Sequence, residues 1–245
     1  MYKSILGLIL SGLLFSCNAS YQHLANADVE YIRTTENISG NTEIHDMVAP
    51  YKTEMEAQMN EVLGMLPEDL KKDRPNSNMG NWFCDALQSM AEKHYGPEVD
   101  FSLQNYGGLR LPFLGKGELI KSQIYELMPF DNKLVVLKLD GNNTQKLLDA
   151  IAEDRGWPMS RGVEFKAQHE KAVDIKIKGA EFDINKVYYV AMPDYVANGG
   201  GGCDFLKGFE QFDTGLFIRD AVIEYLQDLK KSNTPITVDN STRIF

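Results

Sequence analysis

Residues 104–110 read Gln-Asn-Tyr-Gly-Gly-Leu-Arg and place two amides, two glycines and a guanidinium in one short segment. The Asn105 amide can donate and accept hydrogen bonds, and the planar guanidinium of Arg110 suits a phosphate or a carboxylate. Gly107 and Gly108 allow the backbone to approach a ligand closely. Because Gly-Gly pairs also form ordinary turns, this segment alone leaves open whether it binds a ligand or only reverses the chain.

Two further segments favour the binding interpretation. Residues 194–202 read Asp-Tyr-Val-Ala-Asn-Gly-Gly-Gly-Gly, so Gly199 and Gly200 belong to a second glycine loop that follows an aromatic side chain. Residues 129–132 read Pro-Phe-Asp-Asn and form a turn between the two loops in the sequence. The three segments together predict a ligand-binding protein.

The residue types needed for metal or nucleophilic catalysis are not grouped in this sequence. The histidines are His23, His45, His94 and His169. None stands in an Asp-x-His, Asn-His-Glu or Gly-His-x-His arrangement, which a two-metal phosphoesterase site would need. No Ser/His/Asp or Cys/His set is evident either. We therefore expect no catalytic residue, no metal site and no cofactor in this chain.

The bulk composition is that of a globular protein with a real core. The chain has 245 residues, of which 43% are hydrophobic, and this length fits one large domain. Its net charge of −10 argues against a nucleic-acid polymer as partner, because a phosphate backbone needs a basic surface. A single nucleotide needs only one or two local cations and stays compatible with this charge.

Residues 1–17 have the features of a bacterial lipoprotein signal peptide. Lys3 supplies the positive charge, and the apolar run after it is too short to cross a membrane as a helix. The run ends in Leu-Phe-Ser-Cys, which resembles a lipobox, so we expect cleavage before Cys17 and a lipid on its thiol. An ordinary signal peptide with a chance cysteine is the alternative. Residues 18–27 then form a tether, and residues 28–245 form one domain anchored to the membrane in the bacterial cell envelope.

Two cysteines, Cys84 and Cys203, follow in the expected domain. They are far apart in the sequence and either pair as one disulfide in an oxidising compartment or stay as inert thiols. Cys84 falls within an apolar helix pattern, which favours a buried small hydrophobic side chain. No Cys-x-x-Cys spacing supports a structural zinc site.

Apolar periodicity predicts the elements that position these segments. Spacings of three and four predict helices over 42–60, 78–95, 122–128, 144–152 and 218–229. Short apolar runs predict strands over 28–35, 62–66, 99–105, 134–139, 173–177 and 187–192. Because these elements lack a regular strand–helix alternation, we predict an α+β domain with a mixed sheet and packed helices.

Three local expectations accompany this assignment. The apolar side chains of the first helix are expected in the core: Ile44, Met47, Val48, Tyr51, Met55 and Met59. Residues 68–74 are expected to form a polar connection without regular structure. Gly141 and Asn142 are expected to form a turn.

Five ordered segments resemble one known family. They read Asn-Met-Gly-Asn at 78–81, Asn-Tyr-Gly-Gly-Leu-Arg at 105–110, Gly-Glu-Leu-Ile at 117–120, Pro-Phe-Asp-Asn at 129–132 and Tyr-Val-Ala-Asn-Gly-Gly at 195–200. Together they resemble the C-terminal domain of the 5′-nucleotidase family, which includes bacterial UDP-sugar hydrolases and animal ecto-5′-nucleotidase. The resemblance covers nearly all of residues 28–245 and implies a domain that recognises the nucleoside part of a nucleotide.

The resemblance also implies roles for individual residues. Phe130 and Tyr195 match the aromatic pair that holds the base between two rings, and such stacking tolerates different bases. Asn105 matches a contact to the base or ribose, and Asn132 matches a base contact in bacterial members. Arg110 matches an arginine that reaches the phosphate or ribose side.

Arg74 matches a further phosphate-binding arginine ahead of the Asn-Met-Gly-Asn segment, although its spacing differs slightly. Family members carry an aspartate for the ribose hydroxyls where this chain has Gly201. Losing those two hydrogen bonds weakens ribose binding by about 2–4 kcal/mol. Asp204 can replace that aspartate only if the loop rearranges.

In the family, a separate N-terminal metallophosphoesterase domain holds two divalent metals and performs the hydrolysis. That half has no counterpart in this sequence, so the enzymatic status of the isolated chain stays open. Three functions are compatible with the residues. The chain is the recognition part of a split nucleotidase whose metallophosphoesterase is encoded separately, a non-catalytic envelope protein that binds nucleosides or nucleotides, or a degenerate domain kept for protein interaction.

Overall fold

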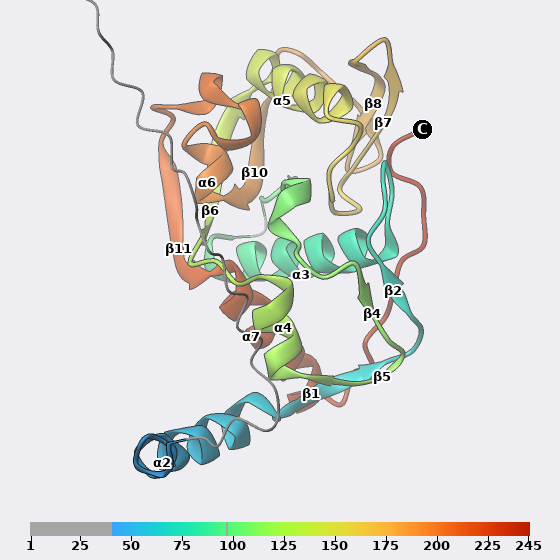
Figure 1. Cartoon of the computed structure of the whole chain (residues 1–245). Coiled ribbons are helices and arrows are strands. Elements are labelled where there is room, and N and C mark those ends of the chain that lie inside the picture. The colour runs from blue at the N-terminus through green and yellow to red at the C-terminus, as the bar shows by residue number, and fades with distance from the viewer. Residues whose placement is uncertain (1–40, 97) are drawn as a thin grey trace, which may run out of the picture. The chain divides into compact units, whose positions relative to one another are not determined.

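The structure is a computed structural model that describes residues 41–96 and 98–245. The expected signal peptide, Cys17, the tether 18–27 and the strand expected over 28–35 lie outside the described residues. The chain divides into two compact units, residues 1–48 and 49–245. The sheets and all helices after residue 59 belong to the second unit (Figure 1).

Helix α2 (Thr42–Met59) confirms the predicted helix but not its predicted burial. None of its residues is buried, and Ile44, Met47, Val48, Tyr51 and Met55 are all exposed. Periodic apolar residues determine that a segment can form a helix, whereas burial needs a second surface against the same face. The prediction that this stripe belongs to the core is therefore wrong for the described residues.

The central sheet has four strands in the order β11-β6-β10-β3. Its members are β3 (Phe101–Ser102), β6 (Lys133–Asp140), β10 (Val187–Pro193) and β11 (Gln211–Phe217). Strand β6 runs antiparallel to β10 and to β11, and β3 pairs parallel to β10. This mixed sheet and its helices confirm the predicted α+β class.

Smaller sheets surround the central one. They pair β1 (Val62–Leu66) with β5 (Gly117–Ile120), β2 (Leu70–Lys71) with β4 (Phe113–Leu114), and β7 (Val163–Gln168) with β8 (Lys171–Ile177) and β9 (Ala180–Glu181). Strands β4, β5, β7, β9 and β11 were not predicted, and the connection expected over 68–74 contains β2. β11 is largely exposed and so carries no continuous apolar run. β7 is buried only in its first half.

Five helices complete the second unit. They are α3 (Asn78–His94), α4 (Lys121–Leu127), α5 (Gly141–Glu153), α6 (Asp194–Ala197) and α7 (Ile218–Lys231). Helix α3 begins where the Ser77 hydroxyl accepts a hydrogen bond from the Gly80 amide at 2.9 Å, which is a normal N-cap.

The turn expected at Gly141 is wrong. Asp140 caps α5 by accepting a hydrogen bond from the Asn143 amide at 2.8 Å, so Gly141 is the first helical residue. A Cβ at Gly141 would overlap the backbone of Ile184, and this close approach explains the glycine.

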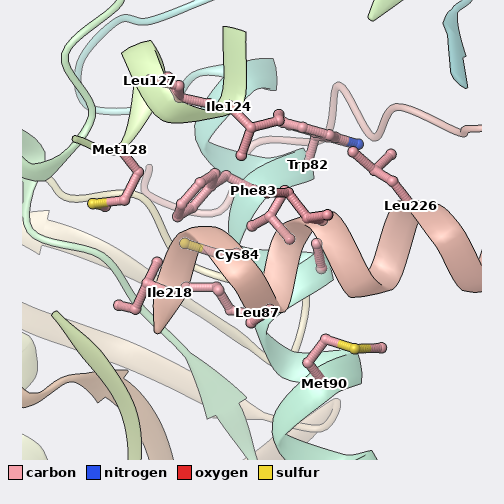
Figure 2. Packing of buried hydrophobic residues seen from close by; sticks show 14 of the residues in the cluster. Trp82, Phe83, Cys84, Leu87, Met90, Ile124, Leu127, Met128, Ile218 and Leu226 are labelled. Carbon is pink, nitrogen blue, oxygen red and sulfur yellow. The ribbon is translucent and has the colours of Figure 1, made fainter. Parts of the chain in front are cut away.

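The central sheet separates two hydrophobic cores, because alternate side chains of a strand point to opposite faces. On β6, Leu134 and Val136 belong to the first core, whereas Val135 and Leu137 belong to the second. The first core is built mainly from α3, α4 and α7, and Figure 2 shows Phe83 and Leu87 of α3 facing α7. The second core lies between the sheet, α5 and the β7–β8 hairpin. The two cores fix the sheet, and the candidate loops extend from it.

Candidate functional site

The first glycine loop leaves the sheet directly after β3. The strand predicted over 99–105 is therefore too long, because the chain turns away to let the Gln104 amide bond to the Pro158 carbonyl at 3.0 Å. Residues 106–108 form one 3₁₀ turn, in which the Gly108 amide donates to the Asn105 carbonyl at 2.9 Å. A Cβ at Gly108 would overlap the Gln104 side chain, so the turn needs glycine there. The structure thus supports a shaped loop.

The Asn105 side chain is oriented by its neighbour. Gln104 is buried, and its Nε2 donates to Asn105 Oδ1 at 2.9 Å. The carbonyl end of the Asn105 amide is therefore engaged, while its Nδ2 is the end left to donate to a ligand.

Lys72, which belongs to none of the sequence motifs, holds this loop. Its Nζ donates to the Leu109 carbonyl at 2.7 Å and lies 4.0 Å from the centre of the Tyr106 ring. Burial lowers the pKa of Lys72, and the positive charges of Arg110 and Arg74 lower it further. Three cations thus gather at one loop of an acidic protein. Three basic residues within four positions, in the segment Lys71-Lys72-Asp73-Arg74, were the available signal in the sequence.

Arg74 is engaged by protein groups. Its Nη2 pairs with Asp154 Oδ2 at 3.0 Å, Nη1 also donates to the Asp154 backbone carbonyl, and the guanidinium lies 3.9 Å from the centre of the Tyr106 ring. Asp154 also accepts a hydrogen bond from Trp157 Nε1 at 2.6 Å. The structure therefore places Arg74 in a structural ion pair beside the loop, and its binding role stays a prediction.

Arg110 and Phe130 are brought together. The Arg110 guanidinium lies 4.8 Å from the centre of the Phe130 ring, although the two residues come from different loops. Phe130 is half-buried and packs against the first core, while Arg110 is exposed. A cation over an aromatic face is attractive, so the contact presents a ring and a positive charge together at the surface.

Asn132 connects this turn to the second loop. Its Nδ2 donates to Asp194 Oδ1 at 3.0 Å, and Asp194 is the first residue of α6. The next residue, Tyr195, is 49% exposed. The turn with Phe130 and the helix with Tyr195 are therefore tied together by one side-chain hydrogen bond.

The second glycine loop lies against two aromatic rings. A Cβ at Gly200 would overlap the Tyr195 ring, and a Cβ at Gly201 would lie 2.8 Å from Cη2 of Trp157. Gly199 and Gly201 have positive φ values of 95° and 67°, which suit glycine. Trp157 therefore occupies space that a larger residue at 201 would need. The nearby Asp204 carboxylate is exposed and pairs with Lys207 at 2.5 Å.

The two cysteines of the described residues are not paired with each other. Cys84 and Cys203 are both free and buried, so the alternative of inert thiols holds. Burial and, to a smaller extent, the charge of Asp204 together raise the pKa of Cys203 to about 11. Within residues 41–96 and 98–245, no group of three His, Cys, Asp or Glu side chains is placed to hold a metal ion. Across that same part of the chain, no helix has both the length and the apolar character of a membrane span.

Known proteins resemble this chain in sequence and in fold. A family model described as 5′-nucleotidase, C-terminal domain, matches residues 58–208. The protein UshA of Escherichia coli is 27% identical over 208 residues, which are 81% of this chain and 36% of UshA. A cell wall protein of Listeria monocytogenes is 22% identical over 88% of this chain and 31% of its own length.

A crystal structure of a 5′-nucleotidase precursor from Thermus thermophilus has the same fold, with a TM-score of 0.69 and 24% identity. The match covers 83% of this chain and 43% of that one. This chain therefore spans less than half the length of the relatives that it matches.

Proposed function

Because this chain belongs to the family of 5′-nucleotidase C-terminal domains, we propose that it recognises the nucleoside part of a nucleotide in nucleotide catabolism. We further propose that a separate metallophosphoesterase chain docks on it, holds two divalent metals and performs the hydrolysis. The observation that carries the proposal is the link between the two aromatic segments, in which Asn132 bonds to Asp194 beside Tyr195.

The chemistry of the two segments suits a nucleotide. Each aromatic ring offers a face to a base, and stacking is worth about 1–3 kcal/mol per base. Arg110 adds a positive charge at the Phe130 ring, where it can meet a phosphate or the edge of the base. Asn105 Nδ2 offers a further polar donor beside the first glycine loop.

The extent of the family match supports the proposal that a partner chain performs the hydrolysis. The match is to a C-terminal domain, and UshA, of which this chain covers 36%, is a much longer protein. A partner chain that supplies a two-metal site would provide the attacking water and stabilise the developing charge. This chain would then contribute binding and orientation only.

We also propose that the protein is a lipoprotein anchored through Cys17 in the bacterial cell envelope. The apolar run before Cys17 supports this, and the similarity to a cell wall protein of Listeria monocytogenes is consistent with it. Mass spectrometry of the purified protein tests it. A diacylglycerol-modified Cys17 at the N-terminus is expected, and an unmodified cysteine would contradict the anchor.

Calorimetric titration tests the recognition function directly. The protein is titrated with adenosine, AMP and UDP-glucose, and the measurement is repeated for the Phe130→Ala/Tyr195→Ala double variant. We expect binding of at least one ligand by the wild type and a loss of about 30-fold or more in the double variant, because each removed ring costs about 1–3 kcal/mol of stacking. Phe212→Ala is the matched control, because this exposed ring packs on Tyr95. Absence of heat with all three ligands would contradict the proposal and favour a domain kept for protein interaction.

A second candidate is a non-catalytic envelope protein that captures nucleosides or nucleotides. The observation that favours it is that both aromatic segments, Arg110 and both glycine loops lie within this one chain. Mixing the protein with a metallophosphoesterase chain encoded beside it distinguishes the two. Complex formation and phosphate release from AMP support the split enzyme, whereas binding without any complex supports simple capture.

A further inference from the structure

The turn that carries Phe130 is held by a residue far away in the sequence. Arg219 lies in the first turn of α7, and its Nη2 pairs with Asp131 Oδ1 at 2.6 Å. Its Nη1 donates to the Phe130 backbone carbonyl at 3.3 Å. One guanidinium therefore holds the turn through two contacts, one to the backbone of Phe130 and one to the carboxylate of Asp131.

The guanidinium itself is fixed in place. It lies 5.0 Å from the centre of the Tyr125 ring and 5.3 Å from that of Phe217, and only 15% of the Arg219 side chain is exposed. Among described residues, its Nε has no hydrogen-bond partner, and Asp220 Oδ1 lies 3.6 Å from it. Because the rings already restrict the side chain, little conformational entropy is lost when it grips the turn.

The backbone of α7 adds a second tie to the same turn. The Ile218 amide donates to the Asn132 carbonyl at 2.8 Å, and Phe217 pairs with Lys133 across β11 and β6. α7 supplies none of the predicted ligand contacts. Its first helical turn is nevertheless bonded to three successive residues of the Pro129–Asn132 segment.

From these contacts we infer that Arg219 is a positioning residue that holds the Pro129–Asn132 turn, and with it the Phe130 ring, in the orientation that binds the base. This inference rests on the proposed nucleoside-binding function. Asp131 is 75% exposed and faces solvent apart from this pair, so its ion pair alone is weak. The bond to the Phe130 carbonyl distinguishes Arg219 from an ordinary surface arginine, because it acts on the backbone that carries the ring.

Two measurements on Arg219→Ala and Arg219→Lys test the inference: AMP affinity by titration and amide hydrogen exchange along the chain. For Arg219→Ala we expect about tenfold weaker AMP binding, the size of losing one hydrogen bond to a charged group. Exchange should become faster at residues 130–133 and stay unchanged in β1, because a positioning role acts locally. Arg219→Lys keeps the positive charge but lacks the planar guanidinium. Its AMP affinity and its exchange rates should therefore lie between those of the wild type and those of Arg219→Ala.

Arg161→Ala is the matched control, because Arg161 is also an arginine paired with an aspartate, Asp85, but it contacts no part of the turn. This variant should bind AMP like the wild type. Unchanged AMP affinity in Arg219→Ala, or faster exchange spread equally over β1 and the turn, would overturn the inference. If the wild type binds no nucleotide, the proposed function fails. Exchange then still decides whether Arg219 holds the turn, and unchanged exchange at 130–133 would refute that as well.

Discussion

The two aromatic sides of the candidate site are held in different ways. Phe130 sits on a turn that is gripped from α7 by Arg219, and its ring meets the guanidinium of Arg110. Tyr195 stands at the start of α6, and its ring lies over Gly200, where no side chain intervenes. The Phe130 side is held by long side chains from distant elements. The Tyr195 side instead needs a glycine, which leaves room for the ring because it has no side chain.

This difference predicts which kind of substitution disturbs each side. Removing a side chain is expected to loosen the Phe130 side, because its turn is held by hydrogen bonds and an ion pair. Adding a side chain is expected to disturb the Tyr195 side, because its loop has no room beside the ring. Asn132 joins the two sides through Asp194, so a change at that bond reports how far they act as one site.

The largest effect is expected when either ring is removed. Phe130→Ala and Tyr195→Ala should each weaken AMP binding by about 1–3 kcal/mol, because each removes one stacking face. Tyr195→Phe keeps the ring and should bind like the wild type. Titration of the single variants measures these losses. If only one alanine variant loses affinity, the base is held by one ring, and the comparison of two sides breaks down.

A smaller effect is expected from adding one methyl group to the second loop. In Gly200→Ala the new Cβ overlaps the Tyr195 ring, so the ring must move. Overpacking of this kind destabilises a protein by about 1–3 kcal/mol when the neighbours are fixed. We expect an effect at the lower end of this range because Tyr195 is half exposed. The measured quantity is AMP affinity.

The control for that variant is Gly115→Ala, whose Cβ would be 3.5 Å from the nearest atom and whose φ is not positive. It should leave AMP affinity unchanged. Equal affinity for Gly200→Ala and Gly115→Ala would show that the position of Tyr195 does not matter for binding.

Breaking the bond between the two sides should cost about 1 kcal/mol of AMP affinity, the usual net value of one hydrogen bond. The change is Asn132→Ala, with Asn240→Ala as the control, since Asn240 bonds to the surface residue Glu68. A double-mutant cycle with Asp194→Ala isolates the pair. A coupling energy near zero would mean that the two sides are positioned independently.

Protonation of Asp154 should weaken its contacts with Arg74 and Trp157 only slightly. Burial of the Asp154 carboxyl raises its pKa, but the hydrogen bonds from Arg74 and Trp157 and the charge of Arg74 outweigh this and hold the pKa below its ordinary value of 3.8. A depressed pKa contributes stability that is present above the ordinary value and is lost as the pH falls through the folded-state value.

The melting temperature should therefore fall less steeply in Asp154→Asn than in the wild type as the pH is lowered past 3.8. The corresponding difference in the free energy of unfolding should be a fraction of about 1 kcal/mol, because the Asp154 side chain is half exposed and solvent screens its ion pair with Arg74. Parallel curves for the two proteins would show that this ion pair does not stabilise the fold.

The smallest effect is expected at the sugar. Position 201 carries no carboxylate, and the nearby Asp204 pairs with Lys207. Adenosine and 2′-deoxyadenosine should therefore bind within about twofold of each other, which is less than one hydrogen bond. Clear preference for adenosine would mean that another polar group reaches the ribose, and Asp204→Ala would then identify it.

Local patterns were sufficient to predict the longer helices and the strands β1, β3, β6, β8 and β10. Apolar periodicity specifies α3 and a short apolar run specifies β6, because both depend on residues that are near one another in the sequence. The order of the glycine and Pro-Phe-Asp-Asn segments likewise indicated the family. The same local reasoning failed for the exposed strand β11, which has no apolar run to reveal it.

The contacts that shape the site were decided only by the tertiary structure. Lys72 meets Leu109 across 37 positions, Asn132 meets Asp194 across 62, and Arg219 meets Phe130 across 89. α2 shows the same limit from the other side, since its apolar stripe predicted a helix correctly and burial wrongly. The sequence by itself determined which segments form helices, strands and glycine loops, because those preferences are set by neighbouring residues. Which side chains grip the loops was determined by how the sheet and its two cores bring distant segments together, because charge pairing and hydrogen bonding depend on distance in space.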